Sequence, residues 1–170
     1  MIRDTLTAIV LRELRALRRE IEGYASEADI WAAPSGISNS AGNLALHLCG
    51  NLQHYVGAVL GNTGYQRVRD LEFSRRNVPR SELLDEIDAT IAAVERTLPA
   101  IEPSVLTSPY PEPVGGNTLM GEEFLLHLLS HLAYHLGQVD YHRRIVTGSA
   151  GVVSNVNVKE LPSAMAARER

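Results

Sequence analysis

Apolar residues recur every three or four positions through the first two dozen residues of the chain. This spacing places them on one face of a helix, because each residue advances about 100° around the helix axis. Charged residues fill the other positions, as expected for a helix that packs on a core. The pattern predicts an amphipathic helix over residues 2–24, with an apolar face formed by Ile2, Leu6, Ile9, Val10, Leu14, Leu17 and Ile21.

Three further segments show the same period and have residues typical of helix ends beside them. Ser38 and Ser40 can cap the second segment, Pro79 opens the third, and Gly148 follows the fourth. These signals predict helices over residues of about 40–60, 80–98 and 118–147.

The segments between these helices lack a clear period. Residues 61–79 have an irregular pattern, residues 99–117 contain five of the eight prolines, and residues 149–170 show no period. Because no strand pattern competes, we expect an all-α fold, a four-helix bundle with long irregular connections and a short non-helical C-terminal tail. At this length we expect one domain over residues 1–170.

All six histidines of the chain fall in two of the predicted helices. The histidines of the fourth predicted helix lie along one face and form a stripe. Phe124, Leu128 and Ile145 flank this stripe, so it is predicted to face inward. The second helix carries a corresponding stripe with Asn43, His47, Asn51 and His54. The stripe in the fourth helix consists of His127, His131, His135, Gln138 and His142.

Several inward-facing imidazoles need a common partner, because burying a polar group without a hydrogen bond costs a few kcal/mol. A divalent metal supplies one, since two histidines at i and i+4 can bind the same ion. His47 and His54 lie seven residues apart, about 10 Å along a helix, so one ion cannot bind both. Spacing alone leaves the choice between His127/His131 and His131/His135 open.

Composition narrows the classes of function. The net charge of −4 argues against a nucleic-acid-binding surface, and no apolar run approaches the length of a membrane span. Basic clusters such as "RVRDLEFSRR" are predicted to be solvated helix faces and loop. The first twenty residues do not fit a signal peptide, so we expect a cytoplasmic protein. The single cysteine, Cys49, lies about 160° from His47 on its helix and is predicted to be a buried structural thiol.

The segment "SHLAYHLGQVDYHRRIVTG" resembles the DinB-like family of metal-dependent four-helix-bundle proteins. The family pattern is His-x-x-x-His-x-Gly-Gln, here represented by His131, His135, Gly137 and Gln138, before an arginine-rich helix end and a glycine. The segment "NLALHLCGN" matches a second landmark of the family, a histidine in the second helix, here His47.

This resemblance implies an open metal site with His47, His131 and His135 as ligands and zinc or nickel as the ion. His54 is the competing choice for the second-helix ligand. Some relatives use such a metal to transfer a low-molecular-weight thiol, so the resemblance implies a thiol S-transferase acting on small molecules. Homodimers are common among relatives, so we expect one here. Residues expected to line the pocket or to hydrogen-bond the ligands are Asn51, His54, His127, Tyr134 and Gln138.

Two other functions fit the same histidines. In a hydrolase, a metal-bound hydroxide would attack the substrate beside a general acid or base, and Glu122 and Glu123 are the nearest carboxylates in sequence. These two side chains are expected instead to cap or solvate the start of the helix. A non-catalytic module would use the ion to hold a ligand, and a purely structural site would need a fourth protein ligand.

Overall fold

The computed structural model describes residues 2–151 and 156–166, and within these ranges the chain forms helices and no strands. The all-α prediction is therefore confirmed. Four long helical segments account for most of the fold. They are α1 (Ile2–Glu22), α3 (Ala41–Leu52) continued by the π-helix η1 (Gln53–Leu60), α5 (Arg80–Thr97) and α7 (Gly121–Thr147).

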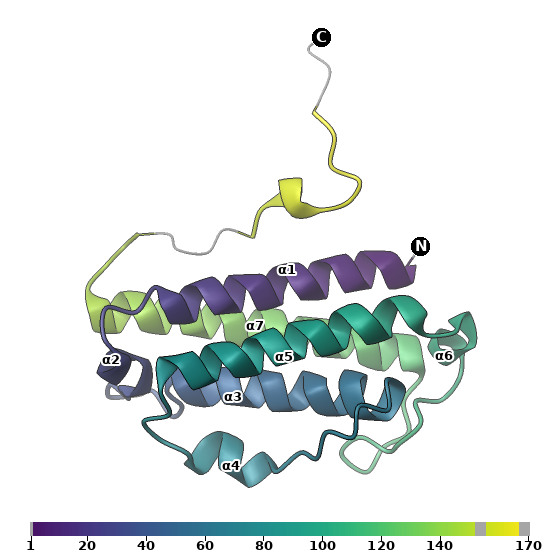
Figure 1. Ribbon diagram of the computed structural model, residues 1–170, viewed down its shortest axis with the longest axis horizontal. Helices are drawn as coiled ribbons and strands as arrows, with labels where there is room; N and C mark the ends of the chain where they lie inside the picture. The colour runs from purple at the N-terminus through teal and green to yellow at the C-terminus, as the bar shows by residue number, and fades with distance from the viewer. Residues whose placement is uncertain (1, 152–155, 167–170) are drawn as a thin grey trace.

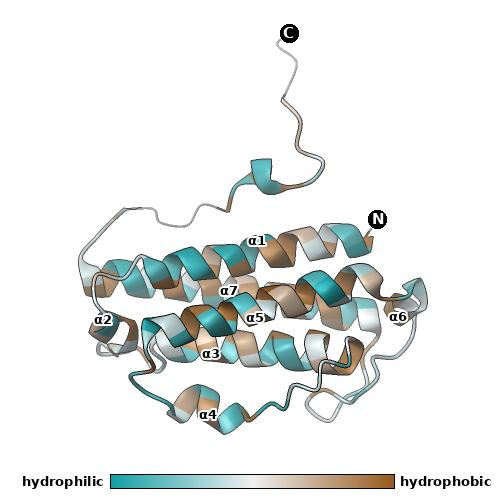
Figure 2. Cartoon of the chain, in the orientation of Figure 1, coloured by the Kyte–Doolittle hydropathy of each residue, from teal (hydrophilic) through white to brown (hydrophobic). Residues whose placement is uncertain are grey.

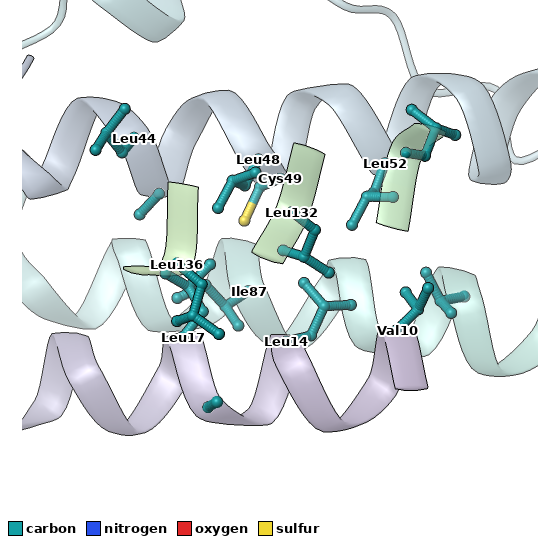
Figure 3. Packing of buried hydrophobic residues seen from close by; sticks show 14 of the residues in the cluster. Val10, Leu14, Leu17, Leu44, Leu48, Cys49, Leu52, Ile87, Leu132 and Leu136 are labelled. Atoms are coloured by element: carbon teal, nitrogen blue, oxygen red, sulfur yellow. The ribbon is translucent and has the colours of Figure 1, made fainter. Parts of the chain in front are cut away.

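The long helices lie side by side around a shared core (Figure 1). Helix α1 packs on α5 and α7, and α3 packs on the same two helices. The core between them consists of aliphatic side chains from all four, several of which Figure 3 shows meeting at the centre. Brown and teal bands alternate along the helices in Figure 2, as an amphipathic pattern requires. Labelled core residues include Leu14, Leu17, Leu48, Ile87, Leu132 and Leu136.

The ends of the long helices follow the predicted signals. The Ser40 side chain accepts a hydrogen bond from the Asn43 backbone N–H and caps α3. Pro79 is the N-cap of α5. Gly148 ends α7 in the left-handed region with φ of 66°, a conformation that costs glycine little.

The connections are more ordered than the sequence predicts, because three short helices lie in them. These are α2 (Glu27–Trp31), α4 (Arg69–Ser74) and α6 (Pro103–Thr107), and the 3₁₀ turn η2 (Leu98–Ala100) ends α5. Helices α3 and α5 run in the same direction, so the chain returns along the outside of α3 between them (Figure 1). This return places α4 against α3.

The tail is mostly non-helical where the structure describes it. It contains one 3₁₀ turn, η3 (Val158–Glu160). For residues 152–155 and 167–170 of the tail, the prediction lies outside the described residues. None of the helices in the described part of the chain is long and apolar enough to cross a membrane.

Candidate metal centre

Three imidazoles from two helices converge on one side of the fold. His47 comes from α3, and His131 and His135 lie one turn apart on α7. One ligand nitrogen from each ring lies within 4.8 Å of the others. The Nε2 atoms of His47 and His131 are 3.1 Å apart, so two imidazole nitrogens of the same kind are in contact. No other group of three or more potential ligands is found in residues 2–151 and 156–166.

The ring of His47 is fixed by a buried carboxylate on α4. Its Nδ1 lies 2.8 Å from Oε2 of Glu72, so the Nδ1–H donates to the carboxylate and the Nε2 lone pair faces the other histidines. Arg67 donates to both oxygens of Glu72, from Nε at 2.6 Å and from Nη2 at 2.9 Å. This chain of contacts sets both the tautomer and the orientation of His47.

His135 is oriented by a contact within its own helix. Its Nδ1 lies 2.6 Å from Oε1 of Gln138, so the Nδ1–H donates to the amide oxygen. The Nε2 of His135 is therefore left with its lone pair. Gln138 is among the residues predicted to line the pocket or to hydrogen-bond a histidine of the cluster, and its amide oxygen contacts His135.

His131 lacks such a partner. Within residues 2–151 and 156–166, its single hydrogen-bond contact is with the Nε2 of His47, and its buried Nδ1 has no partner. A buried ring nitrogen without a hydrogen-bond partner is costly, because its desolvation is not compensated. The structure thus leaves one ring nitrogen of the three converging histidines unsatisfied.

Electrostatics hold the imidazoles in the form that binds metal. Burial lowers the pKa of His131 to about 4, with a further decrease from the charges of His135 and His47. Burial also lowers the pKa of His135. Burial alone would raise the pKa of Glu72, but hydrogen bonds from His47 and Arg67 outweigh it and lower the pKa. Near pH 7 these two imidazoles are neutral and Glu72 is ionised.

The arrangement fits a divalent ion. Metal–nitrogen bonds of about 2.1 Å in a tetrahedral site put ligand atoms roughly 3.4 Å apart, and the observed separations bracket this value. The cluster offers three protein ligands, and His131 and His135 are only half-buried, so one side is open. The three-histidine cluster is thus compatible with metal binding at an open site.

The sequence model of the DinB superfamily matches residues 8–139, which include all three histidines. The chain belongs to the DinB superfamily. No curated protein and no solved structure matches the chain. Membership of the DinB superfamily confirms the predicted resemblance, and its helical fold presents the cluster between α3 and α7.

In this DinB-family chain His54 lies away from the cluster. It is on η1, and its Nε2 donates to Oε1 of Glu112 at 2.7 Å. Of the two second-helix candidates, the structure therefore brings His47 to the α7 histidines. Asn51, one turn after His47, is buried, and its Oδ1 has no hydrogen-bond partner.

The inward stripe predicted along α7 is wrong at His127 and Gln138 and at the flanking Ile145, which are all exposed, and is right at the buried His142. His127 is exposed, with its ring stacked 6.3 Å from that of His131. Ile145 is also exposed. His142 is buried, but it contacts Tyr24 and Ala32 rather than the cluster. The face of α7 that bears the cluster is only partly covered, so helical period alone could not identify its buried positions. Tyr134, predicted at the pocket, is exposed with its ring 5.2 Å from that of His135.

Sequence reasoning missed Arg67 and Glu72. The cluster "RVRDLEFSRR" was predicted to be solvated, yet Glu72 is buried and Arg67 half-buried. An acid among several arginines was the available signal, but nothing in the pattern related it to His47.

The other polar candidates behave as predicted. Cys49 is buried, and burial raises the pKa of its thiol to about 12, which makes it a poor nucleophile. Glu122 and Glu123 are exposed in the first turn of α7. Neither belongs to the three-histidine cluster.

Proposed function

We propose that His47, His131 and His135 bind one divalent metal ion through Nε2 and leave a coordination position open. The observation that carries this proposal is the convergence of three ligand nitrogens within 4.8 Å. The Nδ1 atoms of His47 and His135 are already hydrogen-bonded, so their Nε2 atoms have lone pairs available. A cation at this point would replace the nitrogen–nitrogen contact of His47 and His131.

We propose zinc or nickel as the ion, and the donor set suits both. Imidazole is a borderline ligand that suits both ions, whereas Mg²⁺ and Ca²⁺ prefer oxygen. Elemental analysis of the purified protein tests the site directly. We expect about one metal ion per chain, and a chelator should remove it. A chain that holds no metal after purification and takes up none on reconstitution would overturn the proposal.

The open position favours a reaction or ligand binding over a purely structural role. A structural site is closed by a fourth protein ligand, and the cluster in the described residues has three. A metal bound there would lower the pKa of a coordinated thiol or water. We propose a thiol S-transferase acting on a small electrophile.

The chain's own groups around the cluster suit this role. Tyr134 and Gln138 lie beside His135, and the buried Asn51 Oδ1 is an unpaired acceptor one turn from His47. In the transfer, a sulfur–carbon bond forms as the leaving group departs with its bonding electrons. The thiol proton passes to solvent.

Metal-loaded protein, a panel of bacterial thiols and a haloaromatic electrophile test the reaction. We expect thioether formation that requires the metal and is absent in His131→Ala. If adducts form at equal rates with and without metal for every thiol, the transferase proposal is wrong.

Hydrolysis is the weaker alternative because the carboxylates considered as its general base are either committed to other contacts or exposed outside the cluster. Glu72 is committed to His47 and Arg67, and Glu122 and Glu123 are exposed outside the cluster.

A further inference from the structure

A cavity of about 240 Å³ lies between the loop before α3 and the C-terminal half of α7. Leu44 from α3 and Tyr141, His142 and Ile145 from α7 form its walls, and residues 36–39 form its rim. Gln138 also lines it. Because the Gln138 amide oxygen accepts the Nδ1–H of His135, one side chain contacts both the cavity and a proposed metal ligand.

The walls of this cavity are mainly apolar and incompletely covered. Tyr141 and Ile145 are 67% and 58% exposed, although both are large apolar side chains. His142 adds ring surface but no free polar atom, because its two nitrogens already contact Tyr24 and Ala32. Among the residues that the structure describes, no Asp, Glu, Lys or Arg lines the cavity. The walls therefore match an uncharged, apolar occupant.

Size restricts the occupant further. Pockets for drug-sized ligands measure about 300–1,000 Å³, so a cavity of about 240 Å³ takes a smaller molecule, such as one aromatic ring with a short substituent. A thiol with charged groups is a poor match for these walls. The cavity suits the electrophile rather than the thiol.

We infer that this cavity binds the apolar part of a small, uncharged aromatic or aliphatic electrophile, with the Gln138 amide between it and His135. The inference rests on the proposed transferase function and names its substrate class. Gln138 is then a positioning residue, since it contacts both the occupant and the imidazole of His135.

Benzyl alcohol and benzoate provide matched probes, because they share a ring and differ in charge. Both are titrated into isotopically labelled, metal-loaded protein and followed by amide NMR. We expect benzyl alcohol to shift resonances of residues 36–39 and 138–145, including the Gln138 side-chain amide, and benzoate to bind at least about tenfold more weakly.

Two variants on exposed positions of α7 complete the test. Ile145→Asp puts a charge on the cavity wall, and Leu126→Asp puts the same charge on an exposed position outside it. We expect Ile145→Asp to weaken benzyl alcohol binding about tenfold or more and Leu126→Asp to leave it unchanged. Equal binding of the two probes, an unaffected Ile145→Asp variant, or shifts confined to other regions would overturn the inference.

Metal content, measured on the same samples, separates the two proposals. If the metal binds and benzyl alcohol does not shift the cavity residues, the inference about the substrate fails alone. If benzyl alcohol binds the cavity but the protein takes up no metal, the proposed metal-dependent function is wrong. The cavity then binds a small apolar molecule, but that molecule is not the substrate of a metal-dependent transferase.

Discussion

His142 and His131 lie three turns apart on α7, and the protein treats them in opposite ways. His142 is buried with both ring nitrogens satisfied: the Tyr24 hydroxyl donates to Nδ1 at 2.7 Å, and Nε2–H donates to the Ala32 carbonyl at 2.8 Å. His131 has no oxygen partner at either nitrogen. The structural histidine is thus buried with both nitrogens bonded, whereas the candidate ligand is half-buried and its Nδ1 has no partner among the described residues.

Two of the buried carboxylate–arginine pairs, Glu20–Arg143 and Glu72–Arg67, also differ from each other. Glu20 and Arg143 link α1 to α7 within the core, and burial raises the pKa of Glu20 despite the arginine. Glu72 also pairs with an arginine, but the added hydrogen bond from His47 helps to lower its pKa. The first pair joins helices, whereas the second holds an imidazole in place and stays ionised.

Replacing His131 should have the largest effect on metal binding. Losing a residue that only hydrogen-bonds a metal ligand lowers metal affinity by about 10- to 100-fold. Because His131 is itself a proposed ligand, we expect His131→Ala to lower metal affinity by more than about 100-fold. Isothermal titration with zinc measures this affinity. The exposed His127→Ala is the matched control on the same helix, and a metal affinity equally lowered in both variants would contradict the assignment.

Replacing His142 should change stability instead. His142→Ala leaves the Ala32 carbonyl without its partner and leaves the Tyr24 hydroxyl only its longer contact with the Val139 carbonyl at 3.3 Å, so we expect the free energy of unfolding of the metal-free protein to fall by about 2 kcal/mol. Urea denaturation measures this change. The folded variant should still bind one metal per chain. If His142→Ala lost the metal but kept its stability, His142 would be a metal ligand rather than a structural residue.

Replacing Glu72 should weaken the site without removing it. In Glu72→Gln the neutral amide is a weaker acceptor for His47, and we expect metal affinity to fall about 10- to 100-fold. The variant Glu82→Gln, at an exposed carboxylate on α5, is the control and should bind metal normally. A metal affinity that Glu72→Gln leaves unchanged would show that this contact does not orient the ligand.

The metal-free protein should lose stability as the pH falls from about 6.5 towards 4. In the folded state the pKa of His131 is about 4, against an ordinary value of 6.5. Over this window the unfolded chain binds a proton that the folded protein does not, so the free energy of unfolding decreases. Urea titrations at several pH values should show a shallower slope for His131→Ala. An identical slope would contradict the shifted pKa.

Replacing His54 should have the smallest effect. Its Nε2 contacts Glu112 rather than the cluster, so His54→Ala should retain wild-type metal affinity. A lower affinity, equal to that of His47→Ala, would restore His54 as a ligand.

The sequence predicted the long helices well because their apolar period and end signals are local. Ser40, Pro79 and Gly148 each act within a few residues of the helix end that they mark. Short helices such as α4 depend on tertiary packing, and that packing brings Glu72 to His47 across 25 positions. The burial of individual α7 histidines likewise depends on how far neighbouring elements cover the helix, which period does not encode.

An anomalous-difference map of crystals grown with zinc tests the central claim most directly. We expect one peak about 2.0–2.1 Å from the Nε2 atoms of His47, His131 and His135, with a non-protein ligand on the open side. Zinc bound at other residues, or three imidazoles without density between them, would contradict the account.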